Sequence, residues 1–271
     1  MGTFYIVGTP IGNLGDITLR ALETLKNVDC IACEDTRHSM GLLNYYDIKK
    51  PLIACHKFNE KQSVEKLSHL LNEDKNIALI SDAGMPGISD PGAIVVDALR
   101  RLGHKIEVVP GPSAVVSAIA LSGIVHPIFT FIGFLPSKNK DRKSLIEQFK
   151  NINTSLVIYS SPYDVDKDCK FLYTVLGDRG LYVVKELTKI HESSRYTSLE
   201  KVNLEDAKGE YVLIVEPPKQ EELIAKPEGS IEEQVKQLMN EGINKKEAIK
   251  QVAKVNGLSK NDVYQQVMDL D

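Results

Sequence analysis

Blocks of apolar and polar residues alternate through the first part of the chain. Short apolar runs, each of a length typical of a buried strand, lie at residues 3–9, 29–34, 51–55, 76–81 and 105–109. The segments between them carry apolar residues at helical spacing, and in residues 60–73 this spacing places Val64, Leu67 and Leu71 on one face. Repeated strand–helix units of this kind predict a mainly parallel sheet covered by helices.

Acidic residues indicate where two of these helices begin. Asp16 precedes an amphipathic segment that starts at Ile17, and Asp90 precedes Pro91, a residue that suits the first helical position. Aspartate is a favoured N-cap because its carboxylate accepts hydrogen bonds from free amides of the first turn. We therefore expect Asp16 and Asp90 to cap the helices that follow them.

The second half repeats the strand and helix pattern with different spacing. After a boundary near Ser122–Pro127, strands are predicted at 128–134, 155–159, 181–186 and 211–215, and helices near 141–149 and 163–175. A polar linker at 219–230 precedes a small helical module, in which Ser259 and Asp262 form a capping box. The predicted domains are an N-terminal α/β domain at 1–122, a second α/β domain with a mixed sheet at 127–217, and a helical module at 230–271.

Composition excludes several classes of protein. No apolar run is long enough to span a membrane, and four cysteines in 271 residues are too few for a disulfide framework. We therefore expect a cytoplasmic protein with no membrane partner. The net charge of −4 gives no general support for nucleic-acid binding, so any RNA surface must be a local basic patch.

The sequence also argues against a metal site. Cys30 and Cys33 have the spacing of many metal-binding pairs, but both lie in a predicted strand. Residues an odd number of positions apart in a strand point to opposite faces, so these thiols cannot share one metal ion. We interpret them as buried packing residues.

A glycine-rich segment, Ser81–Gly92, follows the fourth predicted strand. In open α/β sheets, loops at the carboxyl ends of strands form the ligand sites. The segment contains separate aspartates and several turn-forming residues, which favours a ligand site over a tight connection without a ligand.

The loop after the first strand, Gly8–Asp16, is also glycine-rich. Its glycines do not have the spacing of a dinucleotide-binding fingerprint, and no Gly-Lys-Ser/Thr follows as in a P-loop. We interpret it as a backbone-lined wall for a ligand without phosphates, with a plain strand–helix turn as an equal alternative.

Polar residues of the segment Glu34–His38 follow the second predicted strand. Asp35 is a candidate proton acceptor, and Arg37 a candidate ligand for a phosphate or carboxylate. Two other interpretations remain open: an acid that binds a ribose, as in Rossmann methyltransferases, and a helix cap with a surface salt bridge.

Basic residues are densest in the loop Pro136–Lys143. Such a loop is either a solvated surface or a clamp for a phosphodiester chain, and its candidate phosphate ligands are Lys138, Lys140, Arg142 and Lys143. Further along the chain, Glu186 is a second candidate base and Lys189 a further phosphate contact.

Several of these segments together resemble one family. Gly8–Thr18, Glu34–His38, Ser81–Gly92, Pro110–Ala114, Gly133–Pro136 and Glu186–Lys189 occur in this order across nearly the whole chain. In this respect the sequence resembles the ribosomal RNA small-subunit methyltransferase I family, which has the tetrapyrrole methylase fold. The resemblance implies two α/β domains with a methyl donor bound between them.

The resemblance also implies an activity and its partners. The expected donor is S-adenosylmethionine, the expected reaction is 2′-O-methylation of a cytidine ribose in small-subunit rRNA, and the expected assembly is a homodimer. The acceptor is either free rRNA or the small ribosomal subunit. Carried over by motif, the implied donor contacts are Pro10, Gly84, Met85, Ile88, Ser89, Ser113, Ala114, Tyr159, Val212 and Leu213.

Two alternatives to this function remain. One is the same fold acting on a tetrapyrrole or a protein side chain. The other is an rRNA-binding protein without catalytic activity, since the segment Tyr159–Asp164 lacks the Glu, His and Arg that the family usually has after this strand. Position 85 is also Met where the family pattern has Thr, which a loop that binds through its backbone tolerates.

Overall fold

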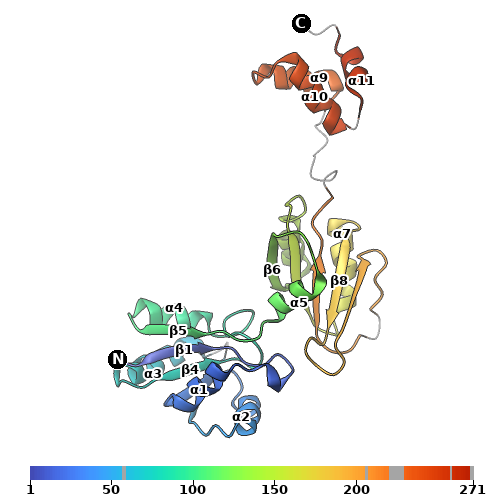
Figure 1. Cartoon of the computed structure of the whole chain (residues 1–271). Helices are drawn as coiled ribbons and strands as arrows, with labels where there is room; N and C mark the ends of the chain where they lie inside the picture. The colour runs from blue at the N-terminus through green and yellow to red at the C-terminus, as the bar shows by residue number, and fades with distance from the viewer. Residues whose placement is uncertain (57–58, 205–206, 220–228, 257, 269–271) are drawn as a thin grey trace. The chain divides into compact units, whose positions relative to one another are not determined.

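The computed structural model describes residues 1–56, 59–204, 207–219, 229–256 and 258–268 (Figure 1). It divides into two compact units: residues 1–150 with 154–217, and residues 218–271 with 151–153. Most of the predicted linker, residues 220–228, lies outside the described residues. No described helix has the length and apolar character needed to cross a membrane.

The first unit begins with a sheet of five parallel strands, in the order β3-β2-β4-β1-β5. The strands are β1 (Thr3–Val7), β2 (Cys30–Cys33), β3 (Leu52–Ala54), β4 (Ile77–Ile80) and β5 (Lys105–Val109). All of these strands were predicted, and the parallel arrangement is confirmed.

Helices cover both faces of this sheet. The helices are α1 (Leu19–Asn27), α2 (Thr36–Tyr45), α3 (Glu60–Asn72) and α4 (Ala93–Arg101). Leu67 of α3 and Leu99 of α4 pack with Cys30 on one face, whereas Leu25 of α1 packs with Cys33 on the other. The two thiols therefore lie on opposite faces, as the spacing predicted.

Helix α1 begins at a different residue from the one expected. Its N-cap is Thr18, whose hydroxyl accepts a hydrogen bond from the Ala21 amide at 3.0 Å. Asp16 instead ends a short 3₁₀ turn, Leu14–Asp16. Threonine is itself a good cap, and the turn before it moves the N-cap two residues beyond Asp16.

The second sheet is mixed and has the order β6-β7-β10-β8-β9. Its strands are β6 (Phe129–Phe134), β7 (Ser155–Ser160), β8 (Gly180–Lys185), β9 (Ser193–Ser198) and β10 (Tyr211–Val215). Strands β6 and β7 are parallel and the remaining pairs antiparallel. The edge strand β9 escaped prediction because it is mostly polar and exposed.

Helices also cover both faces of the second sheet, and one of them corrects the predicted boundary. Helices α6 (Asn139–Glu147) and α7 (Val165–Leu176) cover one face. Helix α5 (Ala114–Ser122), which the pattern assigned to the first domain, packs Val115 and Ala118 against Val157 and Val212 of the second sheet (Figure 1). The chain therefore crosses between the two sheets directly after β5.

The second unit contains α9 (Ile231–Asn240), α10 (Lys245–Asn256) and α11 (Lys260–Gln266) around a small apolar core. The predicted capping box of Ser259 and Asp262 is present at the start of α11. A second box, formed by Ser230 and Glu233, starts α9.

The loops after β1 and β5 touch through their backbones. A Cβ atom on Gly8 would lie 2.7 Å from Gly111 Cα, and a Cβ atom on Gly111 would lie 2.8 Å from Gly8 Cα. Only glycine permits such an approach without displacing the main chain. The contact brings two strand ends together at the carboxyl edge of the first sheet.

This contact makes Gly8 sensitive to substitution. We expect Gly8→Ala to lower the free energy of unfolding by about 1–3 kcal/mol, since the added methyl group meets backbone that cannot rotate away. The matched control is Gly41→Ala inside α2, where a Cβ atom has no neighbour within 4 Å. The free energy of unfolding of the control is expected to rise by about 0.5–1 kcal/mol, because alanine suits a helix interior better than glycine. Thermal unfolding of both variants checks the prediction, and equal midpoints would contradict it.

Candidate active site

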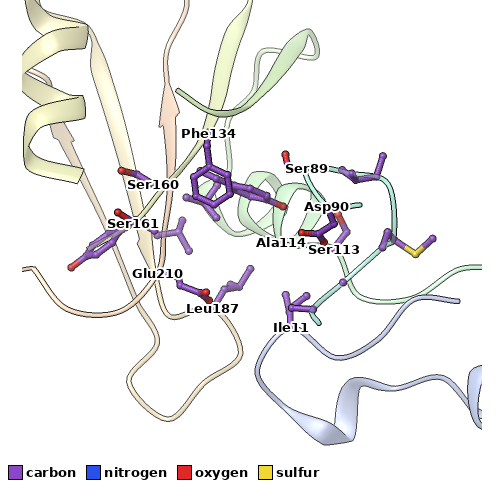
Figure 2. Close-up of a pocket in the computed structure, with 18 of the residues that line it drawn as sticks. Ile11, Ser89, Asp90, Ser113, Ala114, Phe134, Ser160, Ser161, Leu187 and Glu210 are labelled. Atoms are coloured by element: carbon purple, nitrogen blue, oxygen red, sulfur yellow. The ribbon is translucent and has the colours of Figure 1, made fainter. Parts of the chain in front are cut away.

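A pocket of about 280 Å³ lies where the carboxyl-end loops of the first sheet face the second sheet (Figure 2). Such a volume is near the lower end of the range for small-molecule sites. Its lining residues are Ile11, Ala83, Gly84, Met85, Ile88, Ser89, Asp90, Ser113, Ala114, Phe134, Tyr159, Ser160, Ser161, Pro162, Val184, Leu187, Glu210, Tyr211 and Val212.

The loop after β4 forms one wall and is fixed at its start by a short bridge to the loop after β1. The Thr9 amide donates to the Gly84 carbonyl at 2.9 Å, and the Gly84 amide donates to the Thr9 carbonyl at 3.2 Å. The Ser81 hydroxyl donates to the Ala83 carbonyl at 3.2 Å. Backbone pairing therefore holds this loop independently of most of its side chains.

The same loop then makes a turn before α4. The Gly87 amide donates to the Pro91 carbonyl at 3.1 Å, and Ser89 within this turn has a left-handed φ of 64°. Gly87 has φ of 80°, a left-handed conformation that favours glycine.

The N-cap of α4 is Gly92, which corrects the expected role of Asp90. The Gly92 amide is satisfied by the buried carboxylate of Glu60, at 2.7 Å from Oε1. Asp90 lies two residues before this cap and lines the pocket instead (Figure 2).

Aromatic residues of the second sheet form the facing wall. Tyr159 packs edge-on against Phe134, with ring centroids 5.6 Å apart, and against Phe131 at 5.0 Å. Burial, and to a smaller extent the nearby Asp90 carboxylate, raise the pKa of Tyr159 to about 12. The phenol is therefore neutral near pH 7 and cannot act as a base there.

The charge lining the pocket is acidic. Asp90 and Glu210 are lining residues, and the described lining contains no lysine or arginine. Burial, followed by the neighbouring Glu34 carboxylate, raises the pKa of Asp90 to about 6. A mostly apolar pocket with this charge suits a ligand that has an apolar body and a positive centre, and it does not suit a phosphate.

No group of three or more metal-ligating side chains with suitable geometry occurs among the described residues. The four cysteines are free and buried.

Comparison with known proteins gives the family. The model of the tetrapyrrole (corrin/porphyrin) methylases matches residues 3–203. The chain is 38% identical over 272 aligned residues to ribosomal RNA small subunit methyltransferase I of Bacillus subtilis, covering 97% of this chain and 93% of that protein. It is 46% identical over 192 residues to the protein of the same name from Thermotoga maritima, and the alignment covers 71% of this chain and 86% of that protein.

The chain belongs to the ribosomal RNA small subunit methyltransferase I family, within the tetrapyrrole methylases. Solved structures that share its fold include a synthase and a further methyltransferase. Diphthine synthase aligns with a TM-score of 0.63 and 14% identity over 80% of this chain and 90% of that one. Uroporphyrin-III-C-methyltransferase from Thermus thermophilus aligns with a TM-score of 0.57 and 21% identity, over 80% of this chain and 94% of that one.

The donor contacts expected from the family motifs gather at the pocket, apart from Pro10 and Leu213. Gly84, Met85, Ile88, Ser89, Ser113, Ala114, Tyr159 and Val212 all line it. Leu213 points to the opposite face of β10 and is buried in the core against α7. Pro10 is buried beside Ile11, which lines the pocket in its place.

Asp90, Phe134, Ser160 and Glu210 line the pocket but were not among the expected donor contacts. Asp90 was interpreted as a helix cap, and a clearer signal was available, because Pro91 and Gly92 leave room for a turn before the helix. Phe134 and Ser160 end two different strands of the second sheet and Glu210 immediately precedes a third, so only the fold brings them together.

Asp35 lies outside the pocket lining. It is the N-cap of α2 and accepts a hydrogen bond from the Arg37 amide at 2.8 Å, with the Arg37 guanidinium 3.6 Å away. The Arg37 amide, with smaller contributions from neighbouring donors, lowers the pKa of Asp35. The structure therefore matches the alternative of a helix cap with a surface salt bridge, and Asp35 is a weak proton acceptor.

Glu186 is also engaged elsewhere. Its Oε1 accepts hydrogen bonds from Lys189 Nζ at 2.8 Å and from the Glu210 amide at 2.9 Å, and these lower the pKa of Glu186. Lys189 makes a second ion pair with Glu210 Oε2 at 2.9 Å. Although burial opposes the charge on Lys189, the two glutamates raise its pKa. Lys189 would have to leave both partners to bind a phosphate.

Arg142 was expected to hold an RNA phosphate, and the structure contradicts this. Its side chain is 13% exposed, forms an ion pair with the buried Asp168, and packs over the Phe171 ring at 5.0 Å. Asp168 also accepts a hydrogen bond from the Ser160 hydroxyl at 2.5 Å. The helical spacing of the basic loop turns this one cation inward, toward α7.

The other expected phosphate ligands are at the surface. Lys138 is the N-cap of α6, Lys140 and Lys143 lie within it, and all three side chains are exposed; the side chain of Arg37 is 89% exposed. Lys143 has Glu147 at 3.6 Å as its partner.

We expect Arg142→Ala to destabilise the protein. Removing the guanidinium leaves the Asp168 carboxylate buried without its cation, which costs about 3–5 kcal/mol. The expected fall in Tm is roughly 6–20 °C for a chain of this size. The matched control Lys143→Ala removes a neighbouring exposed cation, and its expected change is within about 0.5 kcal/mol. Equal Tm values for the two variants would contradict the assignment.

Proposed function

We propose that this chain transfers the methyl group of S-adenosylmethionine to the 2′-oxygen of a cytidine ribose in small-subunit ribosomal RNA. The observation that carries the proposal is the match to the family along nearly the full length of both proteins. The pocket supports it, because five of the six segments that carry the family motifs contribute lining residues, and only Glu34–His38 contributes none.

The residues present fit this donor. S-adenosylmethionine supplies a methyl group on a positively charged sulfur, and the described lining offers carboxylates and no competing cation. The apolar lining, including Met85, Ile88 and Val212, accommodates an uncharged ring, and the Gly84 region presents backbone groups. We assign the donor contacts to Gly84, Met85, Ile88, Ser89, Ser113, Ala114, Tyr159 and Val212.

The pocket contributes to the reaction mainly by orienting the donor relative to the acceptor. A rigid loop and a packed aromatic wall hold a small ligand in one pose, and alignment of two reactants can supply several kcal/mol of the barrier reduction. The loop has the required stiffness, because it is paired to Thr9 at one end and capped through Gly92 at the other.

For the RNA, we propose that Lys138, Lys140 and Lys143 contact phosphates, with Arg37 as an outlying contact. They are exposed, and α6 follows directly from β6, the strand that ends in Phe134 at the pocket. Arg142 and Lys189 are left out of this surface because their side chains are only 13% and 29% exposed and are held in close ion pairs.

We further propose a homodimer, with the reaction in the cytoplasm, where the proposed substrate is found. Apolar side chains are unusually exposed along one stretch of the chain: Val116 at 62%, Val125 at 95% and Ile128 at 57%. Exposed apolar side chains that recur within so short a stretch favour a protein interface.

A labelling experiment tests the methylation. The chain would be incubated with methyl-labelled S-adenosylmethionine and, separately, with small ribosomal subunits, naked small-subunit rRNA and a tetrapyrrole. The expected product is 2′-O-methylcytidine at one position of the rRNA, identified by mass spectrometry of nuclease fragments. Label in the tetrapyrrole alone, or in no acceptor, would overturn the proposal.

A variant pair links the reaction to the pocket. Ala114→Leu places extra volume in the pocket and is expected to weaken donor binding about tenfold or more, or about 1.4 kcal/mol. Ala120→Leu adds the same volume on the exposed side of α5 and should leave donor binding unchanged. Calorimetry with the donor alone measures both.

The proposed RNA surface has its own prediction. Replacing Lys138, Lys140 and Lys143 together by alanine should weaken rRNA binding and reduce the slope of log K against log salt by about 0.7–0.9 for each phosphate that the protein no longer neutralises. The control replaces Lys61 and Lys66, exposed residues of α3, by alanine. A salt dependence that is unchanged in the triple variant would remove these lysines from the surface.

A further inference from the structure

Asp90 and Glu210 are the carboxylates that line the pocket, and their surroundings differ. Glu210 is paired with Lys189, and its side chain is 77% exposed. Asp90 is half-buried, and no ion pair involves it among the residues that the structure describes. An unpaired carboxylate in a largely apolar pocket is costly to maintain, so a structural role alone does not account for it.

The fold holds Asp90 in place from several sides. The turn from Gly87 to Pro91 encloses it, and Gly92, two residues later, is bound to Glu60. Ser89, immediately before it, packs against β6, because a Cβ atom on Gly133 would lie 2.7 Å from Ser89 Oγ. Figure 2 shows Asp90 beside Ser113, on the wall that faces Phe134.

We propose that Asp90 is the catalytic residue that removes the proton from the ribose 2′-hydroxyl during methyl transfer. This inference rests on the function proposed above. As the bond between the 2′-oxygen and the methyl carbon forms, the bond between that carbon and the donor sulfur breaks, and its electron pair stays on sulfur. The hydroxyl proton passes to the Asp90 carboxylate and then to water, so the products are the methyl ether and S-adenosylhomocysteine.

The groups that face Asp90 from neighbouring elements are acidic or neutral. Glu34 follows β2, Asp82 follows β4, and Tyr159 belongs to β7. Burial, Glu34 and Asp82 raise the pKa of Asp90, and the Ser81 hydroxyl opposes the shift. A raised pKa makes the ionised carboxylate a stronger proton acceptor than an ordinary aspartate, and it is still mostly ionised at pH 7.

The sign of the pH dependence follows from this. A base must be ionised, so the rate should fall as the pH drops through the pKa of Asp90, which is about 6 in the free chain. A cation bound beside the carboxylate favours its ionised form, so the midpoint in the donor complex should lie lower than in the free chain.

The deciding variant is Asp90→Asn, which keeps the shape and removes the basicity. With saturating donor and rRNA, kcat is expected to fall about 100-fold or more, and the acidic limb of its pH profile should disappear. The affinity for the product, whose sulfur is uncharged, should stay within about threefold by calorimetry. The affinity for the donor should fall, because its sulfonium loses a neighbouring carboxylate. The control is Asp97→Asn, which removes a solvent-exposed carboxylate on α4 and should leave kcat unchanged.

Two measurements do not depend on turnover. Asp90→Asn should unfold at a Tm no lower than that of the original chain, because a carboxylate with a raised pKa destabilises the folded state at neutral pH. A ¹³C titration of the aspartate carboxyl carbons should lose the resonance that titrates near the pKa of about 6.

A second variant, Asp90→Glu, retains a base, so its rate should be reduced but should keep the acidic limb of the pH profile.

Three results would overturn the assignment to Asp90. They are a kcat for Asp90→Asn within threefold of the original, a rate that more donor restores, and an acidic limb that survives the substitution. These differ from failure of the proposed function itself, in which the original chain methylates no rRNA in the same assay.

Discussion

The contact between Gly8 and Gly111 sets the geometry on which the pocket depends. It joins the end of β1 to the end of β5, and the bridge from Thr9 to Gly84 joins the same loop to the end of β4. Three loops of the first sheet are thereby fixed to one another mainly through backbone atoms, with the Thr9 hydroxyl as an additional donor to the Ser81 carbonyl. Side chains in these loops can vary, as Met85 does relative to the family pattern, while the main-chain surface stays the same.

The two walls of the pocket provide different chemistry because they come from different kinds of sheet. The parallel sheet contributes glycine-rich loops and one constrained carboxylate, whereas the mixed sheet contributes the rings of Phe134 and Tyr159. The absence of lysine and arginine among the described lining residues agrees with the lack of a phosphate-binding fingerprint at Gly8–Asp16. Charge and loop shape therefore favour the same class of ligand.

Local patterns predicted the parts of this molecule that depend on local interactions. The strands β1, β2, β4 and β10 are apolar runs that are buried in the structure, and the loop Ser81–Gly92 is conspicuous in its composition. The incorrect predictions concern residues whose positions depend on tertiary contacts. Helix α5 has apolar residues around its surface, so its pattern could not indicate which sheet it covers. Arg142 resembled its basic neighbours until the fold placed Asp168 beneath it.

The crossing of the chain directly after β5 has an evolutionary consequence. Everything before it builds the loops of the parallel sheet, and everything from α5 to β10 builds the facing wall. Because hydrogen-bonded strands do not pass from one sheet to the other, substitutions or insertions in the second half leave the first sheet's ladder intact. A duplicated gene of this type could thus acquire a new acceptor by changing one contiguous half of its coding sequence.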